Sequence, residues 1–327
     1  MYHIARRLAI TLSLSSVILG AKAQVAPTDS LGETRRDSVR RLDEVVVYAR
    51  QMLGSKFEAR NRTGSAYYLS PKELKKFGYT DISRMLRAVP GVNIYEEDGY
   101  GLRPNISLRG TKAERSERIS LMEDGILAAP APYAAPAAYY FPNVARMYAI
   151  EVLKGSSQVQ YGPFTTGGAV NMVSTPIPKS FQAGLRTSYG SFGTFNTYAH
   201  LGSDHKHVGY LVEYLRYQSK GFKKDEPNER TGFYRNDVVG KLRLHSDEDA
   251  EIRQALELKL GFSNEQSDES YVGLSEQDFA SRPYYRYRGA QMDQLQTRHT
   301  QTALTHLIDF TGGLKVTTSA YYNYFWR

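Results

Sequence analysis

Arginine and tyrosine side chains alternate in one short segment of the chain, Arg282-Pro-Tyr-Tyr-Arg-Tyr-Arg288. A guanidinium group binds a carboxylate through two parallel hydrogen bonds, so Arg282, Arg286 and Arg288 would suit an anionic, carboxylate-rich ligand. The same composition also allows a loop that folds on itself through contacts between arginine cations and tyrosine rings. The segment is therefore a candidate ligand-binding loop with a structural alternative.

Residues that could carry out catalysis or hold a metal are sparse. The sequence has no cysteine and no G-x-S-x-G, H-E-x-x-H or G-x-x-x-x-G-K-[ST] motif. His205 and His207 form an H-x-H pair, which is more often a polar turn than a metal or haem site. Glu123 and Asp124 lie in a hairpin-turn pattern, so turn formation explains these two residue types better than acid–base catalysis does. The sequence predicts neither an enzyme nor a resident cofactor or metal.

Composition narrows the class further. The 327 residues are enough for one or two domains with real cores. The net charge of +8 is spread along the chain without a long basic run, which indicates a mild preference for anions and no nucleic-acid partner. Tyrosine is frequent, with 25 residues against a single tryptophan, and this suits strands at a membrane interface, where the ring is apolar and its hydroxyl is wet.

The first residues have the pattern of a secretory signal peptide, Met1–Ala23. Arg6 and Arg7 precede an apolar run, and Ala21-Lys-Ala23 fits the cleavage site. The apolar run is shorter than the ~20 residues that a membrane-spanning helix needs. No later segment is apolar enough for such a helix, so a membrane-embedded form of this protein must be a β-barrel.

The first half of the chain reads as short helices and strands around one core. Ser70-Pro-Lys-Glu73 is a capping box that begins a helix, and a second helix opens near Thr80 or Asp81. Asp124-Gly125 between apolar runs predicts a hairpin, because both positions tolerate a positive φ. The residues expected to share the core are Ile82, Leu86, Ile106, Leu108, Leu121, Ile150 and Val152.

The pattern changes after Thr175-Pro-Ile-Pro178. From there we expect strands over residues 181–191, 194–203, 207–219, 233–245, 251–262, 297–310 and 313–327. In the fifth of these, Leu256, Leu258 and Leu260 oppose Glu257 and Lys259. Alternation with a period of two over about ten residues is typical of a transmembrane β-strand, with apolar side chains toward lipid. A soluble antiparallel sheet with one wet face alternates in the same way.

Four motifs follow one another in a fixed order: Ile106-Ser-Leu-Arg-Gly110, Ile119-Ser-Leu-Met-Glu-Asp-Gly-Ile126, Ile150-Glu-Val-Leu-Lys-Gly155 and Tyr161–Ser174. As a set they resemble the plug domain of TonB-dependent outer-membrane receptors, and so does Asp81–Val92 ahead of them. The resemblance implies an α+β plug domain, a small mixed sheet with short helices, followed by the first strands of an antiparallel transmembrane β-barrel. The barrel of this family has 22 strands.

The resemblance also implies a division of the chain. We expect a signal peptide over residues 1–23, a flexible tail over 24–50, the plug domain over 51–178 and barrel strands over 179–327. The pattern of about seven strands breaks off at Trp326-Arg327, so the sequence is expected to be the N-terminal part of a receptor. Seven strands are not expected to close a barrel, and the last would be an open edge. A stably inserted, transporting product of 327 residues would contradict this.

Within the tail, Leu42–Arg50 resembles the TonB box of this family. The resemblance implies that Asp43, Glu44, Val45, Val46 and Val47 are gripped by TonB, which works with ExbB and ExbD in the inner membrane. A Val-rich segment on a flexible tether suits this use, because it can add a strand to the sheet edge of a partner. Alternatively, the same valines form the first strand of the plug sheet, and both states can exist.

In such receptors the outward plug loops contact the ligand. The resemblance therefore implies ligand contacts from Arg115, Arg118, Tyr133 and Tyr139. The residues alone favour a solvated turn in which Arg115 and Arg118 pair with Glu114 and Glu117, and only the resemblance makes ligand contact an equal alternative.

The insertion Glu265–Gln296 resembles the extracellular loop of ferric citrate-type receptors, through Tyr271–Ser275, Asp278-Phe279 and Pro283–Tyr287. This resemblance implies a receptor embedded in the lipid of the outer membrane of a Gram-negative bacterium. It also implies that the receptor imports ferric citrate, with the iron held by its chelator. Haem, cobalamin, another siderophore and an oligosaccharide remain alternative ligands. A secreted two-domain binding module is the alternative from another class.

Overall fold

The computed structural model describes residues 50–76, 81–128, 139–161, 166–224, 231–268, 270, 272–310 and 313–327. These all lie in one compact unit of the chain, residues 40–327. The expected signal peptide and the expected TonB box lie outside the described residues. Among the helices that are described, none has both the length and the apolar character needed to cross a membrane.

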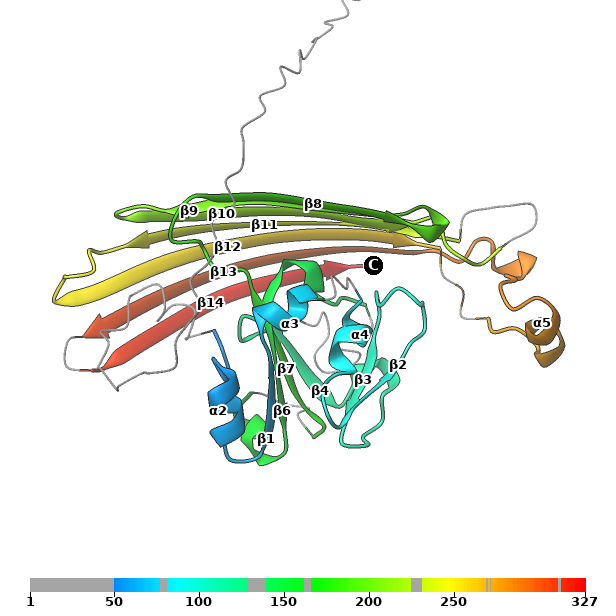
Figure 1. Ribbon diagram of the computed structural model, residues 1–327, viewed down its shortest axis with the longest axis horizontal. Helices are drawn as coiled ribbons and strands as arrows, with labels where there is room; N and C mark the ends of the chain where they lie inside the picture. Colours follow the sequence, from blue (N-terminus) through cyan, green and yellow to red (C-terminus); the bar gives the residue numbers. More distant parts are fainter. Residues whose placement is uncertain are drawn as a thin grey trace, which may run out of the picture. The chain divides into compact units, whose positions relative to one another are not determined.

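The N-terminal domain, described between residues 50 and 178, is built on a five-stranded sheet with the order β1-β6-β7-β4-β5. Its strands in chain order are β1 (Ser65–Leu69), β4 (Ile119–Glu123), β5 (Ile126–Leu127), β6 (Met147–Lys154) and β7 (Gly168–Ser174). β4 and β7 are parallel and the other pairs are antiparallel, so the sheet is mixed. A separate pair, β2 (Val92–Tyr95) with β3 (Asn105–Leu108), packs beside it (Figure 1).

Three short helices accompany this sheet: α2 (Lys56–Asn61), α3 (Pro71–Lys76) and α4 (Ile82–Leu86). The Glu73 carboxylate accepts hydrogen bonds from the Ser70 backbone N–H at 2.9 Å and from its hydroxyl at 2.7 Å, which confirms the predicted helix start. Asp81 caps α4 by accepting from the Ser83 N–H at 2.7 Å. The described part of this domain also contains the short 3₁₀ helices η1 (Glu114–Ser116), η2 (Val144–Arg146) and η3 (Ser156–Tyr161).

The predicted core is confirmed. All seven residues expected there are at most 1% exposed and pack into one cluster: Ile82, Leu86, Ile106, Leu108, Leu121, Ile150 and Val152. The opposite face of the sheet buries a second cluster, which includes Met52, Leu53, Met122 and Leu153. Neighbouring residues of a strand point to opposite faces, so each central strand contributes to both clusters.

The predicted hairpin is also confirmed. Asp124 and Gly125 have φ angles of 55° and 75°, and Glu123 pairs with Ile126 across the turn. Two successive positive φ angles match the two-residue turn whose twist fits a β-hairpin. The turn fixes the direction of the two carboxylates before Gly125.

The second part of the chain is a seven-stranded antiparallel sheet in which each strand pairs with the next. Its elements are β8 (Gln182–Gly190), η4 (Ser191–Gly193), β9 (Thr194–Asp204), β10 (Val208–Ser219), β11 (Phe233–His245), β12 (Ile252–Ser267), β13 (Leu295–Phe310) and β14 (Lys315–Trp326). All seven predicted strands are present. β12 continues past its predicted end at residue 262, because the polar residues up to Ser267 pair in full with both neighbouring strands.

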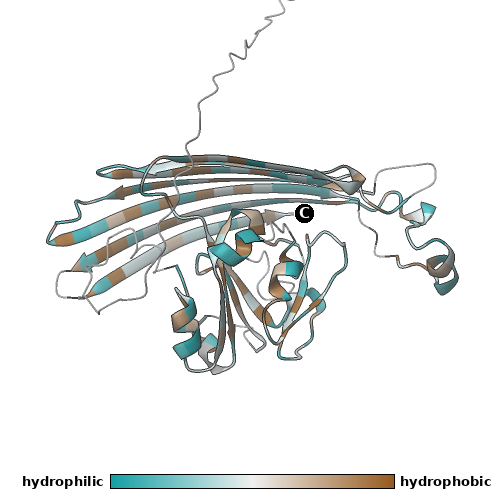
Figure 2. Ribbon diagram, viewed as in Figure 1, coloured by the Kyte–Doolittle hydropathy of each residue, from teal (hydrophilic) through white to brown (hydrophobic). Residues whose placement is uncertain are grey.

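The two faces of this sheet differ as the alternation predicts. On β12, Glu257 and Lys259 are 1% and 2% exposed beneath the N-terminal domain, whereas Leu260 and Phe262 are 50% and 46% exposed on the other face. Figure 2 shows apolar and polar residues alternating along the strands. At one end of the sheet the described turns are short, while at the other end the long connection between β12 and β13 contains α5 (Glu276–Ser281) and η5 (Arg288–Ala290).

Candidate functional site at the domain–sheet interface

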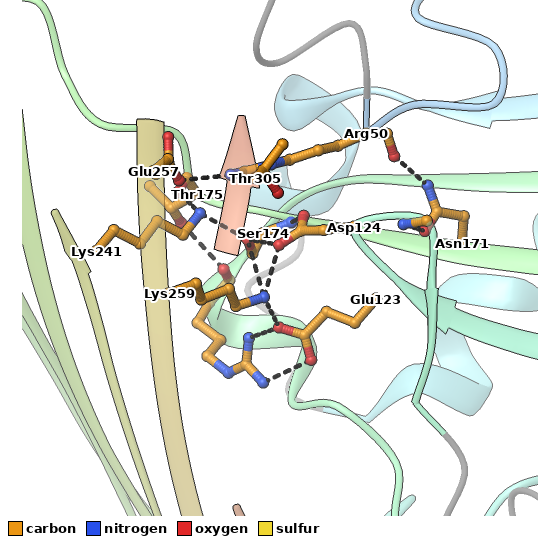
Figure 3. Close-up of polar contacts among 12 residues, drawn as sticks. Arg50, Glu123, Asp124, Asn171, Ser174, Thr175, Lys241, Glu257, Lys259 and Thr305 are labelled. Carbon is orange, nitrogen blue, oxygen red and sulfur yellow. Dashed lines mark hydrogen bonds and ion pairs between the residues drawn. The ribbon is translucent and has the colours of Figure 1, made fainter. Parts of the chain in front are cut away.

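The carboxylates of the β4–β5 hairpin form the centre of a buried ionic network. Glu123 and Asp124 are 0% and 7% exposed. The Lys259 amine of β12 lies 2.6 Å from Glu123 Oε1 and 2.6 Å from Asp124 Oδ2, so one lysine of the sheet reaches both acids (Figure 3). A charge removed from water needs such partners, because an unpaired buried charge is very costly.

Arg146 joins the same network from the N-terminal domain. Its guanidinium binds Glu123 through two nitrogens, at 2.5 and 3.0 Å, while its Nε lies 2.8 Å from Asp237 Oδ2 on β11. The side chain of Asn143 caps the preceding 3₁₀ turn through the Ala145 N–H and helps to direct Arg146 toward the sheet. One guanidinium therefore connects an acid of its own domain with an acid of the sheet.

The electrostatics favour the charged forms of both hairpin acids. Burial alone would raise the pKa of Glu123, but the charges of Arg146 and Lys259 lower the pKa to about 2. Burial likewise opposes ionisation of Asp124, yet Lys259, Lys241 and Arg50 hold the pKa of this carboxyl well below its usual value. Both hairpin acids are therefore ionised at physiological pH.

The chain that leaves the domain is fixed by a second lysine. The Lys241 amine of β11 donates to Ser174 Oγ at 2.7 Å and to the Thr175 carbonyl at 2.5 Å. Ser174 in turn donates to Asp124 from its hydroxyl at 2.5 Å and from its backbone N–H at 2.9 Å. The end of β7 is thus tied to both the hairpin and the sheet.

Two further ion pairs extend the interface toward both ends of β12. Arg50 Nη1 lies 2.7 Å from Glu257, which also binds Arg243 at 2.9 Å. Toward the long loop, Arg103 Nη1 lies 2.6 Å from Glu265. Together with Lys259, β12 therefore contacts the N-terminal domain at three levels along its length. The arrangement holds the domain in one register on the sheet.

The residues predicted to bind ligand on the N-terminal domain are partly brought together. The Arg115 guanidinium contacts the Tyr139 hydroxyl and lies 5.6 Å from the centre of its ring, and the Arg327 guanidinium lies 3.9 Å from the same ring centre. Arg118 lies apart, with its Nε 3.5 Å from the Glu117 carboxylate, as the alternative of a charged turn predicts. Tyr133 lies outside the described residues. Ligand contact by these residues remains a prediction.

The arginines of the long loop have unequal surroundings. Arg282 binds Asp278 at 2.7 Å and lies 4.0 Å from the centre of the Tyr285 ring. Arg286 is 4% exposed and donates to three backbone carbonyls of the loop, those of residues 268, 290 and 293. Arg288 is exposed. The loop folds on itself, as the structural alternative predicts, and Arg286 stabilises that fold. A ligand contact from this loop remains a prediction.

A cavity of about 320 Å³ lies between the segment that follows β2 and the loops at the end of the sheet that carries the β12–β13 connection. The N-terminal domain contributes Tyr95–Asp98 and Tyr100, and the loops contribute Phe222 and Asp268, among others. Glu96 in this segment binds Arg87 at 2.5 Å. Sequence reasoning missed the cavity because its walls are more than a hundred residues apart in the chain.

Both parts of this architecture resemble known proteins. Residues 58–169 match the family model described as the TonB-dependent Receptor Plug Domain. The N-terminal domain therefore has the fold of a plug domain, and the antiparallel strands after it have the fold of the corresponding strands in solved transporter structures. From here the N-terminal domain is called the plug.

Several solved structures share this fold. The unliganded ferric citrate transporter FecA has 20% sequence identity and a TM-score of 0.71, and the match covers 84% of this chain and 41% of that one. The ferric yersiniabactin uptake receptor FyuA from Yersinia pestis has 18% identity and a TM-score of 0.63, covering 82% and 42%. The copper transporter OprC has 20% identity and a TM-score of 0.55, covering 80% and 37%. The chain thus spans about two fifths of the length of these structures.

We expect Lys259→Met to destabilise the plug–sheet interface by about 3–5 kcal/mol, because it leaves two carboxylates buried without their shared cation. Urea unfolding of the full-length protein, followed by protease sensitivity of the plug, measures this. Lys206→Met is the matched control, since Lys206 is exposed at a turn and its loss should change stability by less than about 0.5 kcal/mol.

Adding Asp124→Asn to Lys259→Met should restore part of the lost stability, because asparagine tolerates the positive φ and removes one uncompensated charge. An additive double variant would contradict the pairing.

Acid should weaken the same interface. The pKa of Glu123 is lowered from 4.5 to about 2 in the folded protein, so its contribution is complete above pH 4.5 and is lost as the pH falls toward 2. The free energy of unfolding should therefore decrease steadily over this interval in urea titrations. The decrease should be smaller in Lys259→Met, because one cation that lowers the folded-state pKa is removed. A stability that is constant down to pH 2 would refute this origin of the shift.

Proposed function

We propose that this chain acts in a TonB-dependent receptor of the Gram-negative outer membrane that imports a ferric chelate. The observation that carries the proposal is the plug domain, which is fastened by buried ion pairs to the polar face of strands whose other face is apolar and exposed. An apolar outer face suits contact with lipid, and a polar inner face suits a plugged lumen. A secreted two-domain module would have no need of the exposed apolar face.

The proposed cycle uses binding energy and mechanical work in place of covalent chemistry. Ligand binds at the long loops and the neighbouring part of the plug. TonB, powered through ExbB and ExbD, then grips Asp43–Val47 and pulls. This proposal is supported by the contacts of Arg50–Gly54 with the plug and the sheet, because a pull on Asp43–Val47 would pass to the plug through these residues. The iron is cargo and stays with its chelator.

For the ligand, we propose ferric citrate first. The support is the Arg/Tyr loop with its resemblance to ferric citrate-type receptors. Arg282 and Arg288 are both exposed at the end of the sheet that bears the long loop. A guanidinium fits the carboxylates of such a chelate.

The cavity supports a second candidate ligand. Its plug wall carries Glu96, Glu97 and Asp98, and its loop wall carries Asp268 and Lys223. A wall with more acids than bases suits a chelate that bears positively charged groups better than an anionic one. A siderophore with amine or other cationic groups is therefore the alternative.

Isothermal titration of the full-length receptor with ferric citrate, haem and cobalamin distinguishes these ligands. Ferric citrate should give saturable heat, and Arg288→Ala should weaken its binding roughly 10- to 100-fold by removing a charge-assisted hydrogen bond. Arg84→Ala, which replaces an exposed arginine of α4, is the matched control and should leave affinity unchanged. If ferric citrate gives no heat, that ligand is excluded. Binding that Glu97→Gln weakens instead would favour the cationic chelate.

The tail has its own test. Val46→Pro should abolish ligand uptake and leave ligand binding intact, because proline removes the N–H that a strand pairing with TonB requires. Val46→Ile, which keeps the N–H and a β-branched side chain, should transport normally. Uptake of radiolabelled iron chelate in whole cells measures both. Normal uptake by the proline variant would exclude residues 43–47 as the TonB-binding strand.

A further inference from the structure

The segment that follows the proposed TonB box is attached to the middle of the plug sheet by side chains. The Glu151 carboxylate accepts three successive backbone N–H groups: from Met52 at 2.6 Å, from Leu53 at 3.0 Å and from Gly54 at 2.9 Å. Glu151 is 0% exposed and lies on β6, a central strand. Burial raises the pKa of Glu151, and the hydrogen bonds from the three backbone N–H groups and Asn171 oppose that shift. In its ionised form the carboxylate accepts charge-assisted hydrogen bonds from all three N–H groups.

Asn171 completes this attachment from the neighbouring strand β7. Its Nδ2 donates to the Arg50 carbonyl at 2.9 Å (Figure 3) and to Glu151 Oε2 at 2.9 Å, and its Oδ1 accepts the Gly125 N–H at 2.9 Å. Asn171 is fully buried and faces Glu151 directly in the β6–β7 register. The amide therefore fixes the carboxylate, the incoming chain and the β4–β5 hairpin relative to one another.

We propose that Glu151 and Asn171 form a clamp that holds residues 50–54 and sets the load at which the tail detaches from the plug. The inference rests on the proposed function of the tail as the point where TonB pulls. It goes beyond that function because it names the contacts within the plug that resist the pull once the Arg50–Glu257 ion pair has opened. Glu151 and Asn171 are positioning residues, since they contact neither ligand nor partner.

The order in which elements carry the load follows from the topology. Traction on the tail meets the three hydrogen bonds to Glu151 together, because one carboxylate accepts them all. Without the clamp, the next attachment in the chain after α2 is β1, which lies at the edge of the sheet and pairs with β6. An edge strand pulled from its end separates one hydrogen bond at a time, and this requires less force than breaking several bonds at once. The clamp therefore protects β1 from being peeled off the sheet.

A second carboxylate of the plug provides a matched control. Asp98 also accepts three backbone N–H groups, those of Tyr100, Leu102 and Arg103, at 2.6, 3.3 and 2.9 Å. It organises the segment between β2 and β3, far along the chain from the tail. Asp98→Asn and Glu151→Gln thus remove the same kind of interaction at two places, and the clamp predicts that they have different effects on the tail.

The test is thiol labelling of Met52→Cys in the full-length receptor in outer-membrane vesicles. The sequence printed here contributes no cysteine, and Met52 is buried, so labelling of this thiol by a maleimide reports detachment of the segment. Glu151→Gln should raise the labelling rate roughly 10- to 100-fold, as expected for the loss of hydrogen bonds to a charged group. Asn171→Ala should raise it less, because Glu151 remains, and Asp98→Asn should leave it unchanged.

An unchanged rate in Glu151→Gln, or an equal increase in Asp98→Asn, would overturn the clamp. Heat-modifiable migration on a gel shows whether Glu151→Gln assembles. If it does not, the labelling rate is measured in Asn171→Ala, and an unchanged rate in that variant overturns the proposal. The assay contains neither TonB nor ligand. Its failure therefore leaves the receptor function standing, and a failure of the Val46→Pro test leaves the clamp standing.

Discussion

The contact between Lys259 and the two hairpin carboxylates is the constraint on which the position of the plug depends. The strands that carry apolar residues on one face must carry polar residues on the other, and several of these are ionisable. Once the plug covers them, each charge needs a partner of opposite sign within hydrogen-bonding distance. Lys259 meets this need by reaching two acids that a tight turn presents side by side. The plug therefore has one register on the sheet in which the charges match.

Local patterns in the sequence predict the elements of this structure well. The capping box at Ser70, the Asp124-Gly125 turn and the alternation on β12 each depend on residues that are neighbours in the chain, and each is confirmed. The resemblance to the plug domain rests on the same short motifs. These features could be predicted because propensity, turn chemistry and side-chain periodicity act over a few residues.

Partners across the interface could not be predicted in this way. The sequence predicts Glu123 as a turn residue, and its pairing with Ile126 across the turn confirms this. Its side chain is also a centre of the buried network with Lys259, 136 positions away. Nothing near Glu123 in the sequence identifies Lys259 as its partner. Arg286 shows the converse limit: its place among tyrosines predicts ligand binding, and the structure adds hydrogen bonds to carbonyls of its own loop that the sequence does not indicate. A residue type indicates what an atom can bind, and the fold determines which atom comes within reach.

An interface held by ion pairs can open more easily than an apolar interface. Replacing a buried ion pair by well-packed apolar residues is often neutral or stabilising, so the network is poorly explained by stability alone. An apolar interface would lose its full burial energy when the plug shifts and water enters. Charged groups such as Arg146 and Asp237 instead regain hydration as they separate, which offsets part of the lost attraction. An ionic interface of this kind holds one register while water is excluded and can still open when water enters, as the proposed movement of the plug requires.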